Sequence, residues 1–342
     1  MTSPRTIING NITSIQGIVA ASLFTEFVKW VPPNERARFV CFTILGIPAG
    51  AAMSYPVAGI INYYWNWKYV FYITGGASIL CSLISYLTIK DEPSKDKFIT
   101  KTERMYLKET CPNIEQRKVV IPWKSILTSR PVLAYWNDRF VESWSNSFLM
   151  TCLPLFIKDT YPTNIKDVGI LSGIPHLFSM VSTIIYSWIM DYLRSKGTNS
   201  RTTLHKTFIM IGQIPAASLL MILGFGLDFQ YSMIALSLFK ICFASANVCY
   251  LTLPLDMSLE HANLINSVAM TFKSVGNMIN PIVMGFMVKN HLSEEWHRYF
   301  WFLSIFNLWG AIVFAKYGSG EVQPWAHSYI NTEEPCSSKE MD

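Results

Sequence analysis

The sequence predicts an all-α membrane protein with about nine transmembrane helices, arranged as three and then six. Hydrophobic residues make up 51% of the 342 residues and charged residues only 15%, whereas soluble domains average roughly 25% charged residues. Several apolar stretches also reach about 20 residues, the length that a helix needs to cross a bilayer. These two observations exclude a soluble enzyme, a disordered chain and a nucleic-acid-binding protein.

Three spans are expected within residues 1–89, which we interpret as a partial N-terminal helix bundle. They are Ile12–Val28, Phe39–Tyr64 and Tyr69–Ile89. The first is short, while the other two contain no charged residue. Residues 90–130 are instead crowded with Lys, Glu, Asp and Pro, so we expect them to form a central loop in water.

Six further spans are expected within residues 131–320, as a C-terminal six-helix bundle. They are Pro131–Ile157, Val168–Met190, Thr207–Leu227, Tyr231–Leu253, Ile265–Val288 and Tyr299–Tyr317. Several contain Gly or Pro, which membrane helices tolerate because neighbouring helices satisfy the freed backbone groups. Residues 321–342 are polar and are expected to be a disordered tail.

Lys and Arg residues set the predicted orientation, since cytoplasmic loops carry an excess of them. One face of the predicted arrangement receives 17 Lys and Arg residues and the other face five. The central loop 90–130 and the C-terminal tail are therefore expected in the cytoplasm. An odd number of spans then places the N-terminus on the opposite side.

No cofactor and no metal site is predicted. The chain has seven Cys residues, most of them within apolar stretches, and no set of Cys and His residues has zinc-binding spacing. Sequence motifs of nucleotide-binding, hydrolase or metalloprotease sites are also absent. The sequence therefore predicts a protein that is not an enzyme, lies in a lipid bilayer and binds no nucleic acid.

Six motifs, in order along the chain, resemble those of one carrier family. They are KWVPPNER at Lys29–Arg36, WKYVFYITGG at Trp67–Gly76, the polar stretch Asp91–Tyr106, VGILSGIPHL at Val168–Leu177, DYLRSK at Asp191–Lys196 and GSGEVQPWA at Gly318–Ala326. The pattern is similar to that of the sialin, vesicular glutamate and sodium–phosphate cotransporter family within the major facilitator superfamily. The resemblance implies two helical halves joined by a cytoplasmic loop, with the solute site between them.

The resemblance also implies a function and a location. Its members carry organic anions or phosphate, so a small anionic solute is the expected partner and H⁺ or Na⁺ the coupling ion. The expected location is the plasma membrane or a lysosomal or vesicular membrane. On the family pattern the first three helices would precede Met1, so the chain is expected to be N-terminally truncated. The alternative is a truncated product that does not transport, or a regulatory isoform that pairs with a full-length carrier.

Charged residues inside the predicted spans mark the expected site, because a charge at mid-bilayer costs at least about 2.5–3.5 kcal/mol. Arg139 and Glu142 lie one helical turn apart, and Lys273 and His176 lie in two other spans. We expect Arg139 or Lys273 to hold the anion and Glu142 or His176 to bind the coupling proton. The alternative is that these residues have purely structural roles: an ion pair of Arg139 with Glu142, a pairing of Lys273 with Glu142 or Asp256, and a packing role for His176.

Two further expectations concern charges outside this group. The DYLRSK stretch is expected to form a loop after Met190, in which Asp191 and Arg194 clamp helix ends by ion pairs and gate the carrier. Lys240 is expected to extend its ammonium group to the membrane surface, as long basic side chains near helix ends do.

Overall fold

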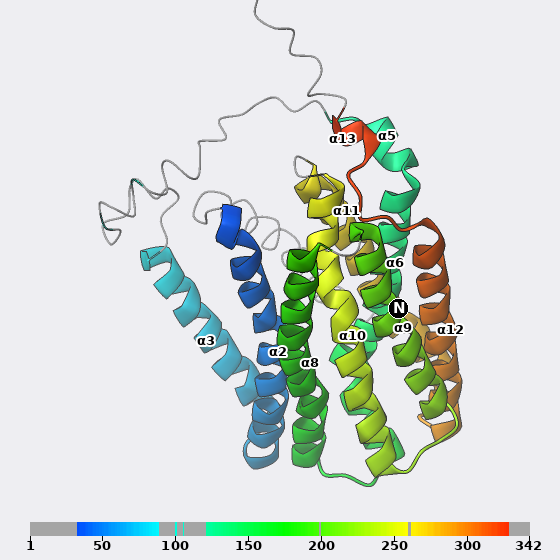
Figure 1. Cartoon of the computed structure of the whole chain (residues 1–342). Coiled ribbons are helices and arrows are strands. Elements are labelled where there is room, and N and C mark those ends of the chain that lie inside the picture. Colours follow the sequence, from blue (N-terminus) through cyan, green and yellow to red (C-terminus); the bar gives the residue numbers. More distant parts are fainter. Residues whose placement is uncertain are drawn as a thin grey trace, which may run out of the picture.

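The computed structural model describes residues 33–88, 100, 105, 121–197, 200–258 and 261–327, and within these ranges all regular structure is helical. Figure 1 shows long helices lying side by side, with the short helices α5 and α13 together at one end. The predicted span Ile12–Val28 lies outside the described residues, as do most of the central loop and residues 328–342. The described residues of the other eight predicted spans are helical almost throughout, the main exception being the end of Thr207–Leu227, where the helix stops at Leu223.

The helices coincide closely with the predicted apolar stretches. They are α2 (Pro33–Tyr64), α3 (Trp67–Thr88), α5 (Trp123–Thr128), α6 (Arg130–Ser147), α7 (Leu153–Thr160), α8 (Ile165–Lys196), α9 (Arg201–Leu223), α10 (Phe229–Met257), α11 (Ala262–Met287), α12 (Ser293–Tyr317) and α13 (Pro324–His327). A π-helical turn, Phe148–Cys152, joins α6 to α7, so these three elements together make the single predicted span Pro131–Ile157. In the described residues, six long helical segments therefore follow residue 130.

Length and composition alone qualify five described helices to cross a membrane: α3, α8, α9, α10 and α12. Helix α6 is not among them, since Asp138, Arg139 and Glu142 interrupt its apolar sequence. Helix α6, the least hydrophobic of the long helices, therefore carries two of the predicted site residues, Arg139 and Glu142.

Two apolar clusters form the interior of the bundle, one toward each end. Along α6, one cluster includes residues up to Trp136 and the other begins at Trp144. Along α9, the same two clusters are separated around Gln213. The charged residues of α6 and the polar residues that face them therefore occupy a buried layer between two apolar layers.

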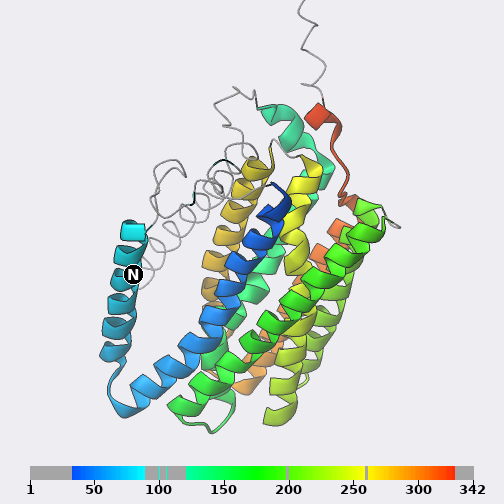
Figure 2. The ribbon, with the colours of Figure 1, turned by 60° about the vertical axis from the view of Figure 1, so that its left-hand side comes forward.

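Helix α2 packs against α8 through glycine. A Cβ atom on Gly169 of α8 would lie 2.7 Å from the carbonyl oxygen of Tyr55 and 2.8 Å from the Cα atom of Gly59, both on α2. Small residues allow membrane helices to approach closely in this way. This contact attaches the N-terminal helices to the C-terminal bundle, whereas α3 leans away from it and contacts mainly α2 (Figure 2).

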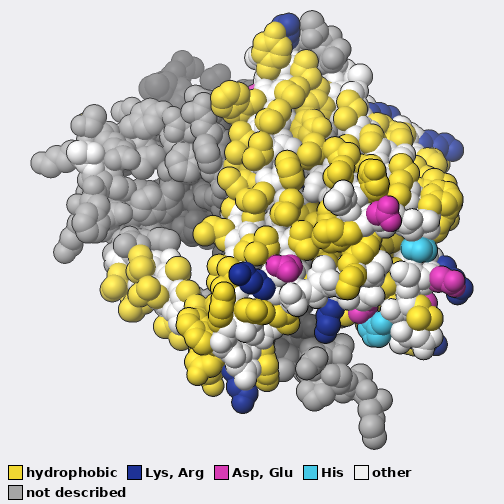
Figure 3. All heavy atoms as spheres, turned by 90° about the horizontal axis from the view of Figure 1, so that it is seen from below, with side chains coloured by type: hydrophobic (Ala, Val, Ile, Leu, Met, Phe, Trp, Pro, Cys, Tyr) yellow, Lys and Arg dark blue, Asp and Glu magenta, His cyan; other side chains and the backbone are white. Residues whose placement is uncertain are grey.

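The end of the molecule opposite α5 and α13 is largely apolar. Figure 3 shows hydrophobic side chains over most of this end, with scattered Lys, Arg, Asp and Glu side chains among them. Its loops are also short: α2 ends at Tyr64 and α3 begins at Trp67, and α11 ends at Met287 and α12 begins at Ser293. On the predicted orientation, which stays a prediction, this end faces away from the cytoplasm.

The prediction of a disordered tail from residue 321 is wrong for its first part. The backbone NH of Gln323 donates to the carbonyl of Met257 at 3.0 Å, and the ring of Trp325 packs edge-on against His261 at 5.8 Å. The segment then forms α13. A tryptophan that packs on a bundle end removes apolar area from water, so this polar-looking sequence has a fixed place.

Replacing Trp325 with alanine should lower the free energy of unfolding by about 1–3 kcal/mol, less than the full cost of a buried aromatic because the side chain is half-buried. Thermal unfolding of the purified protein in detergent measures this. The matched control is Tyr192→Ala, an exposed aromatic at the same end. Equal midpoints for the two variants would show that the C-terminal segment does not stabilise the bundle.

Candidate functional site

A three-member ion-pair network lies at the centre of the buried layer. The two carboxylate oxygens of Glu142 bind different cations: Nη1 of Arg139 lies 3.0 Å from Oε2, and Nζ of Lys273 lies 3.0 Å from Oε1. The Glu142 and Arg139 side chains are only 1% and 5% exposed, whereas that of Lys273 is 22% exposed. The structure thus brings together three of the four predicted cavity residues, and Lys273 alone of the three remains open to its surroundings.

Arg139 is held in place by neighbours from two other helices. Its guanidinium carbon lies 4.5 Å from the ring centroid of Tyr250 on α10, a distance typical of a cation–π interaction. Its Nη2 donates to the Sδ atom of Met270 on α11 at 3.7 Å. Arg139 therefore connects α6, α10 and α11 and is less free than Lys273 to engage another molecule.

A second buried carboxyl group lies one turn before Glu142. Oδ1 of Asp138 accepts a hydrogen bond from Nε2 of Gln213 at 2.6 Å, and the same amide nitrogen donates to the hydroxyl of Tyr250 at 2.9 Å. Asp138 is fully buried, and its Oδ2 has no hydrogen-bond partner among the described residues. Asp138, Gln213 and Tyr250 therefore join α6, α9 and α10 beside the ion-pair network.

His176 lies apart from the ion pairs, at the contact between α8 and α2. Its ring is fully buried and stacks on the ring of Tyr55 with centroids 5.4 Å apart. The Tyr55 hydroxyl in turn donates to the carbonyl of Met150 at 2.5 Å. The predicted proton-binding role of His176 stays a prediction, and the residue lies where the two helical halves meet.

Lys240 does not reach the membrane surface, so that prediction is wrong. The residue is only 3% exposed, and its ammonium donates to Oδ1 of Asn146 on α6 at 3.3 Å. It lies in the middle of α10, about 16 Å from the helix start at 1.5 Å per residue, which is too far for its side chain to reach water. Its charge lies within electrostatic range of Glu142 and Lys273, so Lys240 belongs to the same site.

The ion pairs expected of the DYLRSK stretch exist, but with other partners. Helix α8 continues to Lys196, so Asp191 is an exposed helical residue and not part of a loop. Arg194 instead binds Asp256 on α10, whose carboxylate also accepts from His205 at 2.7 Å and contacts Arg201 at 3.3 Å. The prediction that Asp191 is a clamp residue is wrong, because the helix carries its side chain away from the bundle.

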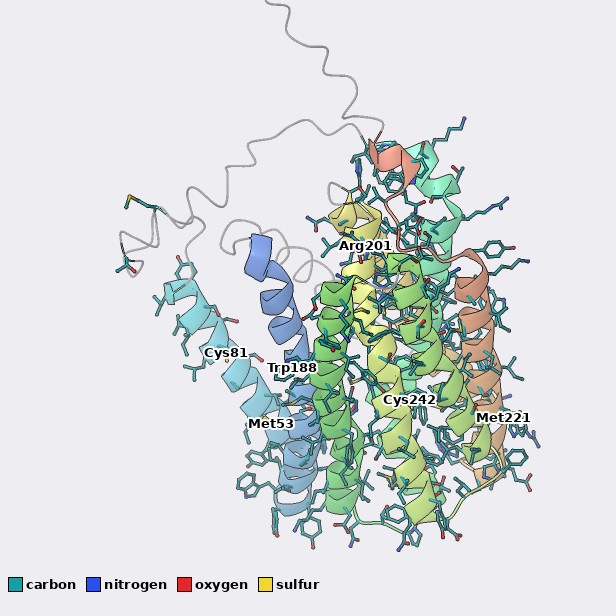
Figure 4. All side chains as sticks on the ribbon, viewed as in Figure 1. Met53, Cys81, Trp188, Arg201, Met221 and Cys242 are labelled. Atoms are coloured by element: carbon teal, nitrogen blue, oxygen red, sulfur yellow. The ribbon has the colours of Figure 1, made fainter. Side chains whose placement is uncertain are left out.

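These four residues, which we name the Asp256 clamp, tie one end of the bundle together. Arg194 lies in the last turn of α8, Arg201 and His205 lie in the first two turns of α9, and Asp256 lies near the end of α10. Figure 4 places Arg201 at the end of the bundle near α13. The alternative pairing of Asp256 with Lys273 is not the one that forms, since Lys273 binds Glu142.

The separation between α6 and α11 is set by a glycine beside the site. A Cβ atom on Gly276 would lie 1.8 Å from Oγ of Ser143 and 3.0 Å from the carbonyl oxygen of Phe140. Only a residue without a side chain allows α11 to lie this close, and Lys273 one turn earlier then reaches Glu142.

Replacing Gly276 with alanine should therefore separate the two helices and lower the free energy of unfolding by about 1–3 kcal/mol. Gly285→Ala on the same helix is the matched control, since a Cβ there has open space within 4 Å. Thermal unfolding of both variants measures the difference. An equal effect at Gly276 and Gly285 would contradict the close packing.

The fold and the site first define a class. Apolar helices of membrane length surround a buried layer of charged residues, which is the arrangement of an integral multi-pass membrane protein with an internal polar site. The particular family follows from the sequence profile of the Major Facilitator Superfamily, which matches residues 13–279. The chain belongs to this family, whose members are transporters and not enzymes.

Comparison with individual proteins agrees with the predicted resemblance. Human vesicular glutamate transporter 2 is 30% identical over 331 residues, which cover 94% of this chain and 56% of that protein. Human sialin is 29% identical over 316 residues, 91% of this chain and 63% of that protein. The crystal structure of a D-xylose–proton symporter has the same fold, with a TM-score of 0.65 over 87% of this chain and 68% of that chain at 15% identity.

These comparisons confirm the predicted fold class and family. The chain spans little more than half the length of the curated relatives that it matches. Asp138, Gln213 and Tyr250 were not among the site residues predicted from the sequence. The sequence held one indication for Asp138, which lies four residues before Glu142. Nothing local in the sequence pointed to Gln213 and Tyr250, since they come from two other helices.

Proposed function

We propose that the chain transports a small anionic solute by alternating access, with the site around Glu142 as the anion-binding site. The observation that supports this proposal is the charge of the buried layer. Arg139, Lys240 and Lys273 place three cations there, against the carboxyl groups of Asp138 and Glu142. A buried excess of positive charge is costly unless an anion compensates it.

Lys273 is the residue that we propose makes first contact with the anion. Its side chain is the most exposed of the buried charges, and its ammonium group has donors beyond the one directed at Glu142. Glu142 is paired with both Lys273 and Arg139. An incoming anion would compete with Glu142 for these cations, so that loading rearranges α6 against α11.

The comparisons support the same class of solute. The names of the vesicular glutamate transporters state glutamate as the solute of those proteins, and glutamate is an anion. The structural neighbour is a symporter that carries its sugar together with protons, as its name states. For this chain we propose an anion as solute and symport with H⁺ or Na⁺. Of the two predicted proton-binding residues, Glu142 is paired with Arg139 and Lys273 and so is not proposed as the proton site, whereas His176 remains a candidate.

The test is uptake into proteoliposomes that contain the purified chain. Radiolabelled L-glutamate, inorganic phosphate and L-lactate serve as probes, each with and without an imposed pH gradient and with Na⁺ or choline outside. We expect saturable uptake of at least one probe that Lys273→Met abolishes and that Lys158→Met, an exposed lysine at the end of α7, leaves intact. Uptake that is equal in the two variants would place the anion site elsewhere.

A second candidate is a regulatory isoform that pairs with a full-length carrier. The observation that favours it is α3, whose apolar membrane-length window, Trp67–Leu87, is 0% buried. Absence of uptake for all probes in well-folded protein, together with co-purification with a co-expressed full-length relative, would select this candidate over transport.

A further inference from the structure

The two buried carboxyl groups of α6 differ sharply in their partners. Both oxygens of Glu142 face cations at 3.0 Å. Asp138 is equally buried but makes no ion pair with any described residue, and Gln213 donates to only one of its oxygens. Two buried acids of the same helix, one turn apart, therefore face opposite electrostatic conditions.

This difference decides which of the two groups exchanges a proton. A carboxylate held between two cations is stable in its ionised form, because protonation would leave two buried cations without compensation. The carboxylate of Asp138 is buried with only neutral neighbours as donors, the amide of Gln213 and the hydroxyl of Tyr250, and has no such compensation. From this geometry we infer that Asp138 is a proton-binding site of the chain and the group through which a proton gradient acts on the anion site.

The surroundings of Asp138 agree with this assignment. The titratable or charged groups that face it are Tyr135, Arg139 and Glu142 on its own helix, and Cys249 and Tyr250 on α10. On α9, the group that contacts Asp138 is the neutral amide of Gln213. On α11, Lys273 binds Glu142 and not Asp138. On α12, the neutral Asn307 contacts α6 at Ser145. Arg139 is the cation nearest along the chain, but its guanidinium is directed to Glu142 and Tyr250.

The network also connects Asp138 to the anion site. The Gln213 amide bridges Asp138 and the Tyr250 hydroxyl, and the ring of Tyr250 carries the guanidinium of Arg139, which binds Glu142. With Asp138 ionised, the five buried charged groups of the site carry one excess positive charge. With Asp138 protonated they carry two. Proton binding therefore strengthens the attraction for an anion, and one proton enters with one negative charge.

This coupling rests on the proposed anion transport, but proton binding at Asp138 can be measured without transport. Infrared difference spectroscopy of the purified protein detects the C=O stretching band of a protonated carboxylic acid as the pH changes. We expect a band in the wild type that Asp138→Asn removes and Glu142→Gln retains. Gln213→Leu should keep the band and move it to higher frequency, because Oδ1 loses its hydrogen-bond donor. Asp191→Asn is the control for an exposed acid.

A band that survives in Asp138→Asn and disappears in Glu142→Gln would overturn the assignment. Size-exclusion chromatography shows whether each variant is folded, and Gln213→Leu tests the same carboxyl group if Asp138→Asn does not fold. Absence of transport with an intact Asp138 band would refute the proposed function and leave the proton site in place.

The coupling has its own readout in the wild type. The affinity for the transported probe should rise by up to about tenfold for each unit of falling pH, the limit for one linked proton. In Asp138→Asn the affinity should be independent of pH. That variant should also lose uptake driven by a pH gradient while it still exchanges labelled for unlabelled probe. Gradient-driven uptake at the wild-type rate in Asp138→Asn would refute the coupling.

Discussion

Replacing Glu142 with glutamine should lower the free energy of unfolding by about 3–5 kcal/mol, among the largest effects of any single change in the bundle. The substitution leaves Arg139 and Lys273 as buried cations without their shared carboxylate, and an unpaired buried charge carries a cost of this size. Unfolding followed by tryptophan fluorescence in detergent measures the change, with Asp191→Asn as an exposed control.

A double variant separates this structural effect from the functional one. In Glu142→Gln combined with Lys273→Met, one of the two cations is removed together with the carboxylate, so part of the lost stability should return while Arg139 stays unpaired. Uptake should remain absent, because the variant lacks the proposed anion contact. Recovery of both stability and uptake in the double variant would show that the pair is purely structural.

Replacing Asp256 with asparagine should reduce uptake at least about tenfold, equivalent to about 1.4 kcal/mol. The carboxylate of Asp256 is the shared partner of Arg194, Arg201 and His205. Without it, the two arginines of α8 and α9 repel each other, and α8, α9 and α10 lose the carboxylate that connects them. Asp191→Asn, in the same helix turn as Arg194 but exposed, should change uptake less than twofold.

Initial uptake rates in proteoliposomes, corrected for the amount of folded protein, measure this effect. The accessibility of Cys249, which is buried beside the clamp and contacts the His205 carbonyl at 3.9 Å, gives an independent readout. A thiol reagent should modify it faster in Asp256→Asn. Unchanged uptake and unchanged labelling would refute a gating role for the clamp.

The site itself was predictable only in part. Arg139, Glu142 and Lys273 were identifiable because charges inside apolar spans are expensive and rare, and the spacing of Arg139 and Glu142 indicated a pair. The sequence could not predict which acid pairs with Lys273, because two acids on different helices, Glu142 and Asp256, fitted equally well. The close approach of α11 to α6 at Gly276 decides it.

Two errors have the same physical origin. Hydropathy ends the apolar stretch of α8 at Met190, but a helix continues as long as its backbone hydrogen bonds and side-chain contacts are favourable, and α8 reaches Lys196. Hydropathy also assigns Gln323 and Trp325 to a polar tail, although both pack on the end of the bundle. In both places contacts between distant segments outweigh local composition.

From the sequence alone one could predict an all-α membrane protein, where its helices run and which charges lie within them, and six motifs indicated the Major Facilitator Superfamily. The helical class and the course of the helices follow from local composition and spacing, since a bilayer imposes the same length and apolarity on every span. The family follows instead from the six motifs that resemble those of the carriers. The tertiary structure was needed to show that Lys240 is buried, that Arg194 binds Asp256 and that Asp138 forms no ion pair within the described part of the chain. Each of these depends on which helices lie side by side, and side-chain contacts across helices leave no periodic trace in a single sequence.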